Sequence, residues 1–280
     1  MHICFHLFGL QIPAYGTMIA LGLVLANAAA MIMARRRGED LNDFILTEAW
    51  CVLCGFAGAK ALYLIVSARQ IDWSAVRGIA GFNALMAGGF VFYGGLIGGL
   101  IGWFLAAKIH KIDAVGIVKR AAFMVPLIHG FGRIGCFCAG CCYGVPYEGP
   151  GAVVFPEGPY TLPGVPLFPV QLTEAAVLFV LAALLLGLQL RTDRRAAADG
   201  TAPRAWTYPV ELYFLVYGAA RFVLEFLRYD DVRGHIGALS TSQVISLAAV
   251  AAGIVLIILK KNGLIAGPAA RAVPAEEGDL

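Results

Sequence analysis

The stretch covering residues 170–190, VQLTEAAVLFVLAALLLGLQL, decides the fold class. Glu174 is its only charged residue, and nearly all the other side chains are apolar. A helix of about twenty such residues is long enough to cross the roughly 30 Å hydrocarbon core of a bilayer. The stretch therefore predicts a transmembrane helix.

The composition of the whole chain agrees with a membrane protein. Of its 280 residues, 60% are hydrophobic and only 14% are charged, and the mean hydropathy is +0.78. A soluble domain carries about a quarter charged residues. The net charge of +3 is small and the basic residues occur in short, dispersed clusters, so we expect no nucleic-acid partner.

Six further apolar stretches predict an all-α membrane protein, a bundle of seven transmembrane helices. The predicted spans cover residues 15–34, 47–67, 84–107, 114–131, 170–190, 208–227 and 241–259. The fourth span is the least regular, because Lys119, Arg120 and Pro126 interrupt it. We expect one membrane domain over residues 1–262 and a disordered tail of small and polar residues over 263–280.

The basic residues predict the orientation of the bundle. They concentrate after the first, third, fifth and seventh spans, whereas the alternate loops hold few. Cytoplasmic loops carry the excess of lysine and arginine. The N-terminus and the loop that begins at Arg133 are therefore expected outside the cytoplasm, and the C-terminus inside.

Three cations are expected at one depth, near the outer ends of their spans: Lys60, Arg133 and Arg221. Tyr217, Arg221 and Glu225 also follow each other at four-residue steps on one helix face. A single charge in a span can be half of a structural ion pair, or it can snorkel to the interface. Three cations at one level favour binding of an anionic lipid phosphate, which the planar guanidinium fork suits best. Four more polar side chains are expected to reach the same level: Tyr15, Tyr93, Gln171 and Glu174.

The third span contains glycines at four-residue steps, Gly94, Gly98 and Gly102, in GGFVFYGGLIGGLIGWFL. Small residues at this spacing are typical of helices that pack closely in membranes. The strand that precedes a phosphate-binding glycine loop is missing, so the glycines predict packing.

Several of these stretches together resemble prolipoprotein diacylglyceryl transferases. They are GGLIGG, HGFGRIGCFCAGCCYG from His129, PVQLTE from Pro169, YGAARFVLEFLR from Tyr217 and LSTSQ from Leu239. The resemblance covers most of the chain. It implies a multi-pass enzyme of the bacterial cytoplasmic (inner) membrane with its active site toward the extracytoplasmic face. Such enzymes transfer the diacylglyceryl group of phosphatidylglycerol to the lipobox cysteine thiol of prolipoproteins, the first step of lipoprotein maturation.

The resemblance also implies roles for particular residues. Arg133 matches the family's signature arginine and is expected to hold the phosphatidylglycerol headgroup. Arg221 and Glu225 match the essential pair of the sixth helix, and Tyr217 the tyrosine one turn earlier. Tyr15, Lys60, Gln171 and Cys136 are expected to line the substrate site, beside other membrane lipids. No cofactor and no metal are expected.

The chain departs from the family pattern at the positions that bear on proton transfer. Tyr93 stands where many members have a histidine that is proposed as the base, and Cys136 and Cys141 replace an asparagine and a glutamate. Tyrosine is a poor base at its ordinary pKa near 10. We therefore keep Tyr93 among the catalytic candidates with His129 and Glu225 as alternatives.

Four cysteines crowd this block: Cys136, Cys138, Cys141 and Cys142. Their C-x-C-x2-C-C spacing differs from the paired CxxC of structural zinc sites, which favours close packing of small side chains around the headgroup site. Four thiols still suffice in number for a tetrahedral metal shell. The alternative function is therefore a divergent paralogue that keeps the lipid-binding bundle but uses this cluster for metal binding or thiol redox chemistry.

Overall fold

The apolar stretches form the long helices of the computed structural model, which describes residues 4–7, 10–87, 89–157, 162–229 and 234–265. Most of the predicted tail, 263–280, lies outside the described residues. The chain divides into two compact units, one made of Met1–Met33 with Lys119–Leu280, the other of Ala34–Val118. We call them the first unit and the second unit.

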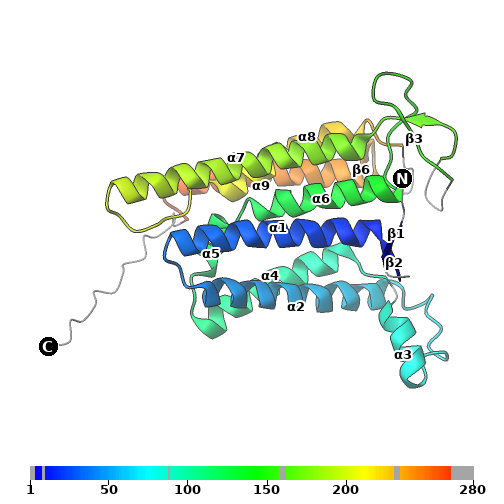
Figure 1. Ribbon diagram of the computed structural model, residues 1–280, viewed down its shortest axis with the longest axis horizontal. Helices are drawn as coiled ribbons and strands as arrows, with labels where there is room; N and C mark the ends of the chain where they lie inside the picture. The colour runs from blue at the N-terminus through cyan, green and yellow to red at the C-terminus, as the bar shows by residue number, and fades with distance from the viewer. Residues whose placement is uncertain (1–3, 8–9, 88, 158–161, 230–233, 266–280) are drawn as a thin grey trace. The chain divides into compact units, whose positions relative to one another are not determined.

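The first unit is built on five helices: most of α1 (Ala14–Arg36), α6 (Met124–Ala139), α7 (Val170–Ala198), α8 (Pro209–Glu225) and α9 (Thr241–Lys261). Antiparallel two-stranded hairpins complete it: β1 (Cys4–Leu7) with β2 (Leu10–Pro13), β3 (Val153–Val154) with β4 (Pro166–Leu167), and β5 (His235–Ile236) with β6 (Leu239–Ser240). Figure 1 shows α7, α8 and α9 running side by side, and α6 packs along α7.

Helix α7 provides much of the buried surface of the first unit. Leu178, Leu181 and Leu185 are buried along one stripe, and Gln171 and Glu174 continue the same stripe at the start of the helix. The helix has 29 residues and is therefore about 43 Å long, which exceeds the hydrocarbon thickness. Its basic last turns thus extend past the apolar segment.

The second unit contains α2 (Leu41–Val66), α3 (Gly78–Ala87), α4 (Phe92–His110) and most of α5 (Ala114–Arg120). Helices α2 and α4 pack along each other through glycines. A Cβ added at Gly94 would meet the carbonyl oxygen of Gly58, and one added at Gly98 would meet that of Cys54. Because only glycine permits this approach of two backbones, the glycines of the third predicted span pack helices as expected.

This contact gives a testable prediction, because a backbone carbonyl cannot swing away as a side chain does. Gly98→Ala should push α2 and α4 apart and destabilise the protein by about 1–3 kcal/mol. Gly187→Ala on α7, where nothing lies within 4 Å of an added Cβ, should leave stability unchanged or slightly higher. Thermal unfolding of the detergent-solubilised chain compares the two. Equal melting temperatures for both variants would contradict the close packing.

Each predicted span falls on a helix, with two differences. Residues 78–87 form the separate helix α3, so the third predicted span, 84–107, starts before its helix α4 begins at Phe92. The fourth predicted span is divided into α5 and α6. Pro126, in the first turn of α6, lacks the amide hydrogen that would bond residue 122 and would clash with its carbonyl, so a continuous helix is disfavoured.

The described helices make the chain a mostly helical, multi-pass membrane protein. Four of them, α1, α2, α7 and α9, are long and apolar enough to cross a membrane, and α5 with α6 makes a fifth if the pair is one broken span. Helices α4 and α8, with 19 and 17 residues, fall outside this set.

Candidate active site

A buried ion pair joins two helices of the first unit where the sequence predicted a headgroup arginine. The Nη2 atom of Arg133, on α6, lies 2.9 Å from Oε1 of Glu174 on α7. The hydroxyl of Tyr217, on α8, donates a hydrogen bond of 2.8 Å to the same oxygen. The Glu174 side chain is 1% exposed and that of Arg133 is 13% exposed. Three helices therefore converge on one carboxylate.

The pair leaves hydrogen-bonding capacity unused. Among the described residues, neither Nε of Arg133 nor Oε2 of Glu174 has a hydrogen-bond partner. Buried polar atoms without a partner are uncommon, and each invites an explanation such as a ligand. A guanidinium held through one nitrogen while a second donor stays available is suited to an oxyanion.

Aromatic rings position the Tyr217 hydroxyl. The ring of Tyr213, one turn earlier on α8, stacks on Tyr217 with centroids 5.5 Å apart. On the other helix, His129 meets the Tyr217 ring edge to face at 5.0 Å. His129 also precedes Arg133 by four residues and so shares its helix face. The imidazole of His129 thus lies beside the tyrosine that donates a hydrogen bond to Glu174.

Glycines bring α6 close to its neighbours. A Cβ at Gly130 would meet the ring of Phe179 on α7, and one at Gly135 would lie 3.1 Å from the backbone of Tyr15 on α1. Gly135 therefore lets α1 approach the helix that carries Arg133. Tyr15 itself is 45% exposed, so much of its side chain remains accessible beside this contact.

A second charged cluster lies at the end of α8. Arg221 Nη1 is 2.6 Å from Glu225 Oε2, and Nε of Arg228 is 4.0 Å from the same oxygen. The hydroxyl of Ser240 donates to Glu225 Oε1 at 2.8 Å, and Arg221 Nη2 donates to the hydroxyl of Ser242 at 3.2 Å. The predicted Arg221–Glu225 pair is thus present, held between two cations and the start of α9.

The LSTSQ stretch supports this cluster through a helix cap. Ser240 is the N-cap of α9: its hydroxyl accepts from the amide of Gln243, and the Gln243 side chain accepts from the amide of Ser240. Such a capping box fixes the first turn of the helix. The same Ser240 hydroxyl contacts Glu225, so the cap also positions the carboxylate.

The cysteine block lies at the end of α6, and three of its four sulfurs come together. The sulfur atoms of Cys136, Cys141 and Cys142 all lie within 4.8 Å of one another, whereas Cys138 is not part of the group. All the cysteines of the described part other than Cys4 are free thiols. Hydrogen bonds with the Cys136 and Cys141 thiols and the nearby Arg228 guanidinium lower the pKa of the Cys142 thiol, while hydrogen bonding to the same two neighbours raises the pKa of Cys141.

The Gln171 side chain holds the backbone of the cysteine block through a hydrogen bond. Its amide nitrogen donates a 2.8 Å hydrogen bond to the carbonyl of Cys141, and its side chain is fully buried. The sequence placed Gln171 in the substrate site. The structure shows it fixing the loop that follows Arg133's helix.

Two predicted site residues belong to the second unit. The ammonium of Lys60 donates to the carbonyls of Leu85 and Met86 near the end of α3, at 2.6 and 3.3 Å, and lies 4.6 Å from the centroid of the Tyr63 ring. Lys60 is therefore a buried cation at a helix C-terminus, where the helix dipole favours it. Tyr93, at the start of α4, is 50% exposed.

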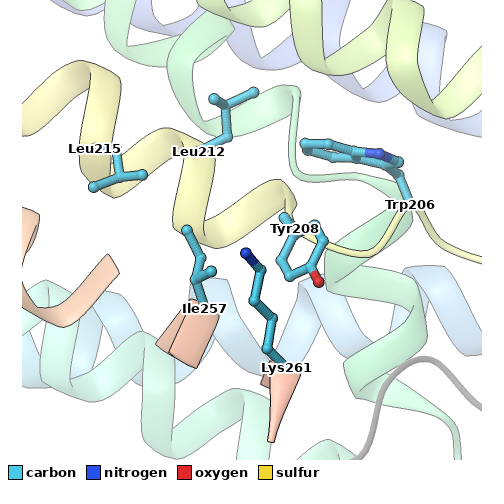
Figure 2. A pocket seen from close by; sticks show the side chains of 6 residues that line it. All are labelled: Trp206, Tyr208, Leu212, Leu215, Ile257 and Lys261. Atoms are coloured by element: carbon cyan, nitrogen blue, oxygen red, sulfur yellow. The ribbon is translucent and has the colours of Figure 1, made fainter. Parts of the chain in front are cut away.

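A small cavity of the first unit lies elsewhere. Figure 2 shows the side chains that line it, at the beginning of α8 and the end of α9: Trp206, Tyr208, Leu212, Leu215, Ile257 and Lys261. The lining is mainly apolar and includes none of the predicted site residues. Nearby, Lys260 forms a buried ion pair with Glu211.

Sequence reasoning placed Glu174 at the level of the site but gave it no partner, and it missed three residues that the structure adds: Arg228, Ser240 and Ser242. A carboxylate in an apolar helix, as at Glu174, is a signal by itself, because intramembrane charges are costly and mark function. The two serines gave no signal beyond the LSTSQ stretch, because their partners come from another helix.

The chain is similar to proteins of one known family. The model of the prolipoprotein diacylglyceryl transferase family matches residues 2–259. A phosphatidylglycerol–prolipoprotein diacylglyceryl transferase of Clostridium tetani is 36% identical over 90% of this chain and 94% of its own length. A second enzyme of that name, from Clostridium perfringens, is 32% identical over 91% of this chain and 93% of its own length. The enzyme of Methylococcus capsulatus is 31% identical over 89% of this chain and 90% of its own length.

Proposed function

Since the chain belongs to the prolipoprotein diacylglyceryl transferase family, we propose that it transfers the diacylglyceryl group of phosphatidylglycerol to the lipobox cysteine thiol of a prolipoprotein. The names of the relatives supply the donor and the protein acceptor. Nothing in these comparisons favours the alternative of a paralogue devoted to thiol or metal chemistry alone. The thiol of the acceptor displaces glycerol phosphate, so a thioether forms as the glyceryl carbon–oxygen bond breaks.

The arrangement around Arg133 is the observation that carries the proposal. Glu174 holds one guanidinium nitrogen, and Nε, which has no partner among the described residues, is available to a phosphate oxygen. The Tyr217 hydroxyl keeps the carboxylate in place. Donors that are already oriented stabilise the charge that develops on the departing phosphate without reorganising.

Arg221 supplies a second positive group for the same anion in this proposal. Glu225 orients Arg221 and is itself held by Ser240 and approached by Arg228. A carboxylate between two cations is stabilised in its charged form and is therefore a weak base. Of His129 and Glu225, His129 is the better placed to accept a proton, because it shares the helix face of Arg133. Tyr93, in the second unit, remains a further candidate.

The other candidates have supporting roles in the substrate site. Tyr15, half exposed beside Gly135, is available to the headgroup or the glycerol backbone. Lys60 is a proposed lipid-binding residue of the second unit, where it holds the end of α3. Cys136 and Gln171 shape the loop after Arg133.

The experiment that tests the function is a transfer assay with the purified full-length chain. It uses vesicles containing phosphatidylglycerol and a synthetic lipobox peptide, and mass spectrometry follows the peptide. We expect the peptide to gain one diacylglyceryl group and to remain unmodified when serine replaces its cysteine. A chain that binds the vesicles and leaves the cysteine peptide unmodified would contradict the proposal.

We further propose seven spans in the bacterial inner membrane, with the N-terminus and the Arg133 site toward the extracytoplasmic face. The alternation of basic loops supports this orientation. The length of α7 also supports it, because Glu157 precedes this helix and Arg194 lies near its end. The two residues should therefore lie on opposite sides of the membrane.

Reporter fusions test this orientation. Alkaline phosphatase fused after Glu157 should be active, and green fluorescent protein fused after Arg194 should fluoresce, since the first reporter works outside and the second inside the cytoplasm. Reciprocal fusions serve as controls and should be silent. Activity of one reporter type at both positions would refute the topology.

A further inference from the structure

The three gathered thiols of the first unit have the geometry of a metal site. The sulfurs of Cys136, Cys141 and Cys142 lie within 4.8 Å of one another. Zinc binds thiolate sulfur at about 2.3 Å, so three sulfurs around a tetrahedral zinc ion are about 3.8 Å apart. The three thiols therefore lie within about 1 Å of that separation.

The chain reversal at the end of α6 creates this group from an irregular spacing. Gly140 ends the helix in the left-handed conformation, and the amide of Cys141 bonds back to the carbonyl of Cys136 at 3.1 Å. Cys142 is itself left-handed, with φ of 59°, a conformation that costs a non-glycine residue energy. Two left-handed residues, Gly140 and Cys142, thus reverse the chain on either side of Cys141 and bring Cys141 and Cys142 back to Cys136.

The loop that carries these thiols is fixed from several sides. Gln171 bonds the Cys141 carbonyl, and the amide of Gly144 bonds the carbonyl of Phe168 at 3.2 Å. The amide of Tyr229 donates to the carbonyl of Tyr143 at 3.3 Å. Outer contacts of this kind keep metal ligands in position.

We propose that Cys136, Cys141 and Cys142 bind one Zn²⁺ ion whose fourth position receives the thiol of the acceptor cysteine. Three protein ligands and one open position are the arrangement of catalytic rather than structural zinc. The described part of the chain offers no fourth histidine, cysteine or carboxylate within this group. Cys136 is buried while Cys141 and Cys142 are partly exposed, so the site is open on one side.

The fourth position rests on the proposed function and gives it a nucleophile. A thiol that coordinates zinc loses its proton, which passes to water or to His129. The zinc-bound sulfur then attacks the glyceryl carbon, and the electron pair of the breaking carbon–oxygen bond leaves with glycerol phosphate. No oxidant or reductant takes part. Zn²⁺ with four thiolates carries two negative charges, and Arg228, beside Cys142, offsets one of them.

The metal site is tested without reference to catalysis. The full-length chain is purified in detergent with a thiol reductant, equilibrated with Zn²⁺ and desalted, and its zinc is measured by mass spectrometry of the element. We expect about one zinc per chain, with affinity at least about tenfold weaker in Cys136→Ser, Cys141→Ser and Cys142→Ser. Cys138→Ser, on the same helix but outside the group, should retain the metal, and all four variants should elute as single species.

The fourth position is tested with Co²⁺, which reports its thiolate ligands through charge-transfer absorption. A lipobox peptide should intensify this absorption, whereas the same peptide with serine in place of cysteine should not. Zinc content near zero, or zinc that all variants retain, would each overturn the metal site. An unchanged cobalt spectrum with the cysteine peptide would overturn the fourth position.

Activity separates this inference from the proposed function. If zinc supplies the nucleophile, a chelator should abolish transfer and Zn²⁺ should restore it. Full transfer by metal-free protein would remove the zinc step and leave the transferase intact. Zinc that binds the three thiols and the peptide without any transfer would instead overturn the proposed function.

Discussion

Arg133→Lys is expected to lower diacylglyceryl transfer by about a hundredfold while the protein still folds. Lysine keeps a positive charge near Glu174, so the carboxylate, 1% exposed, remains paired. Lysine lacks the planar fork, however, so its single nitrogen cannot both contact Glu174 and occupy the position of Nε. Losing one hydrogen bond to a charged group costs about 1.5–3 kcal/mol, and each 1.4 kcal/mol is a factor of about ten in rate.

The comparison needs wild type and Arg133→Lys at equal amounts of folded protein, with transfer and phosphatidylglycerol binding both measured. Arg194→Lys, an exposed arginine in the last turns of α7, is the matched control and should change neither. Loss of transfer in Arg133→Lys alone supports headgroup binding by the guanidinium. Full transfer in that variant would make Arg133 a simple anchor, because a snorkelling cation is replaceable by lysine.

The positions of the helices were predictable because a bilayer imposes length and apolarity on each span. The stretch 170–190 became the core of α7, and Gly94 and Gly98 became helix contacts, since both patterns act within a single helix. The separate helix α3 was not predictable in this way. Residues 78–87 are mostly apolar like part of a span, and only the structure shows that they form a short helix that ends before α4 begins at Phe92.

Contacts between helices were harder to predict than the helices themselves. The Arg221–Glu225 pair follows from the four-residue spacing on α8, and the structure has it. The pair of Arg133 with Glu174 joins residues 41 positions apart on α6 and α7, which no local pattern predicts.

The sequence raised a metal-binding cysteine cluster as an alternative, but it could not show which three sulfurs come together, for a related reason. Spacing in the sequence assumes a regular backbone, whereas Cys141 and Cys142 follow a left-handed residue and a chain reversal.

Removing Glu225 is expected to have the largest effect, a loss of transfer of about a thousandfold in Glu225→Ala. Arg221 and Arg228 both approach this carboxylate, so its removal leaves two buried cations next to each other. Breaking a buried ion pair costs about 3–5 kcal/mol. Arg221→Ala should lose less stability, because Glu225 keeps Arg228 and Ser240 as partners. The double variant should be no less active than Glu225→Ala, since residues that act as a unit are not additive.

The same pair of helices provides the control that separates chemistry from stability. Glu211 and Lys260 form a buried ion pair near the other end of α8 and α9. Lys260→Ala should lower the melting temperature at least as much as Arg221→Ala, because it leaves the buried Glu211 without its cation, whereas Glu225 keeps Arg228 and Ser240 as partners. Its transfer rate per folded molecule should stay near wild type, whereas that of Arg221→Ala should fall at least about a hundredfold. Equal transfer rates per folded molecule in Lys260→Ala and Arg221→Ala would reduce the Arg221–Glu225 pair to a structural contact. Both variants remove a buried ion pair of α8, but at opposite ends of the helix. A fall in transfer confined to Arg221→Ala would therefore place the developing phosphate charge beside the Arg221 guanidinium.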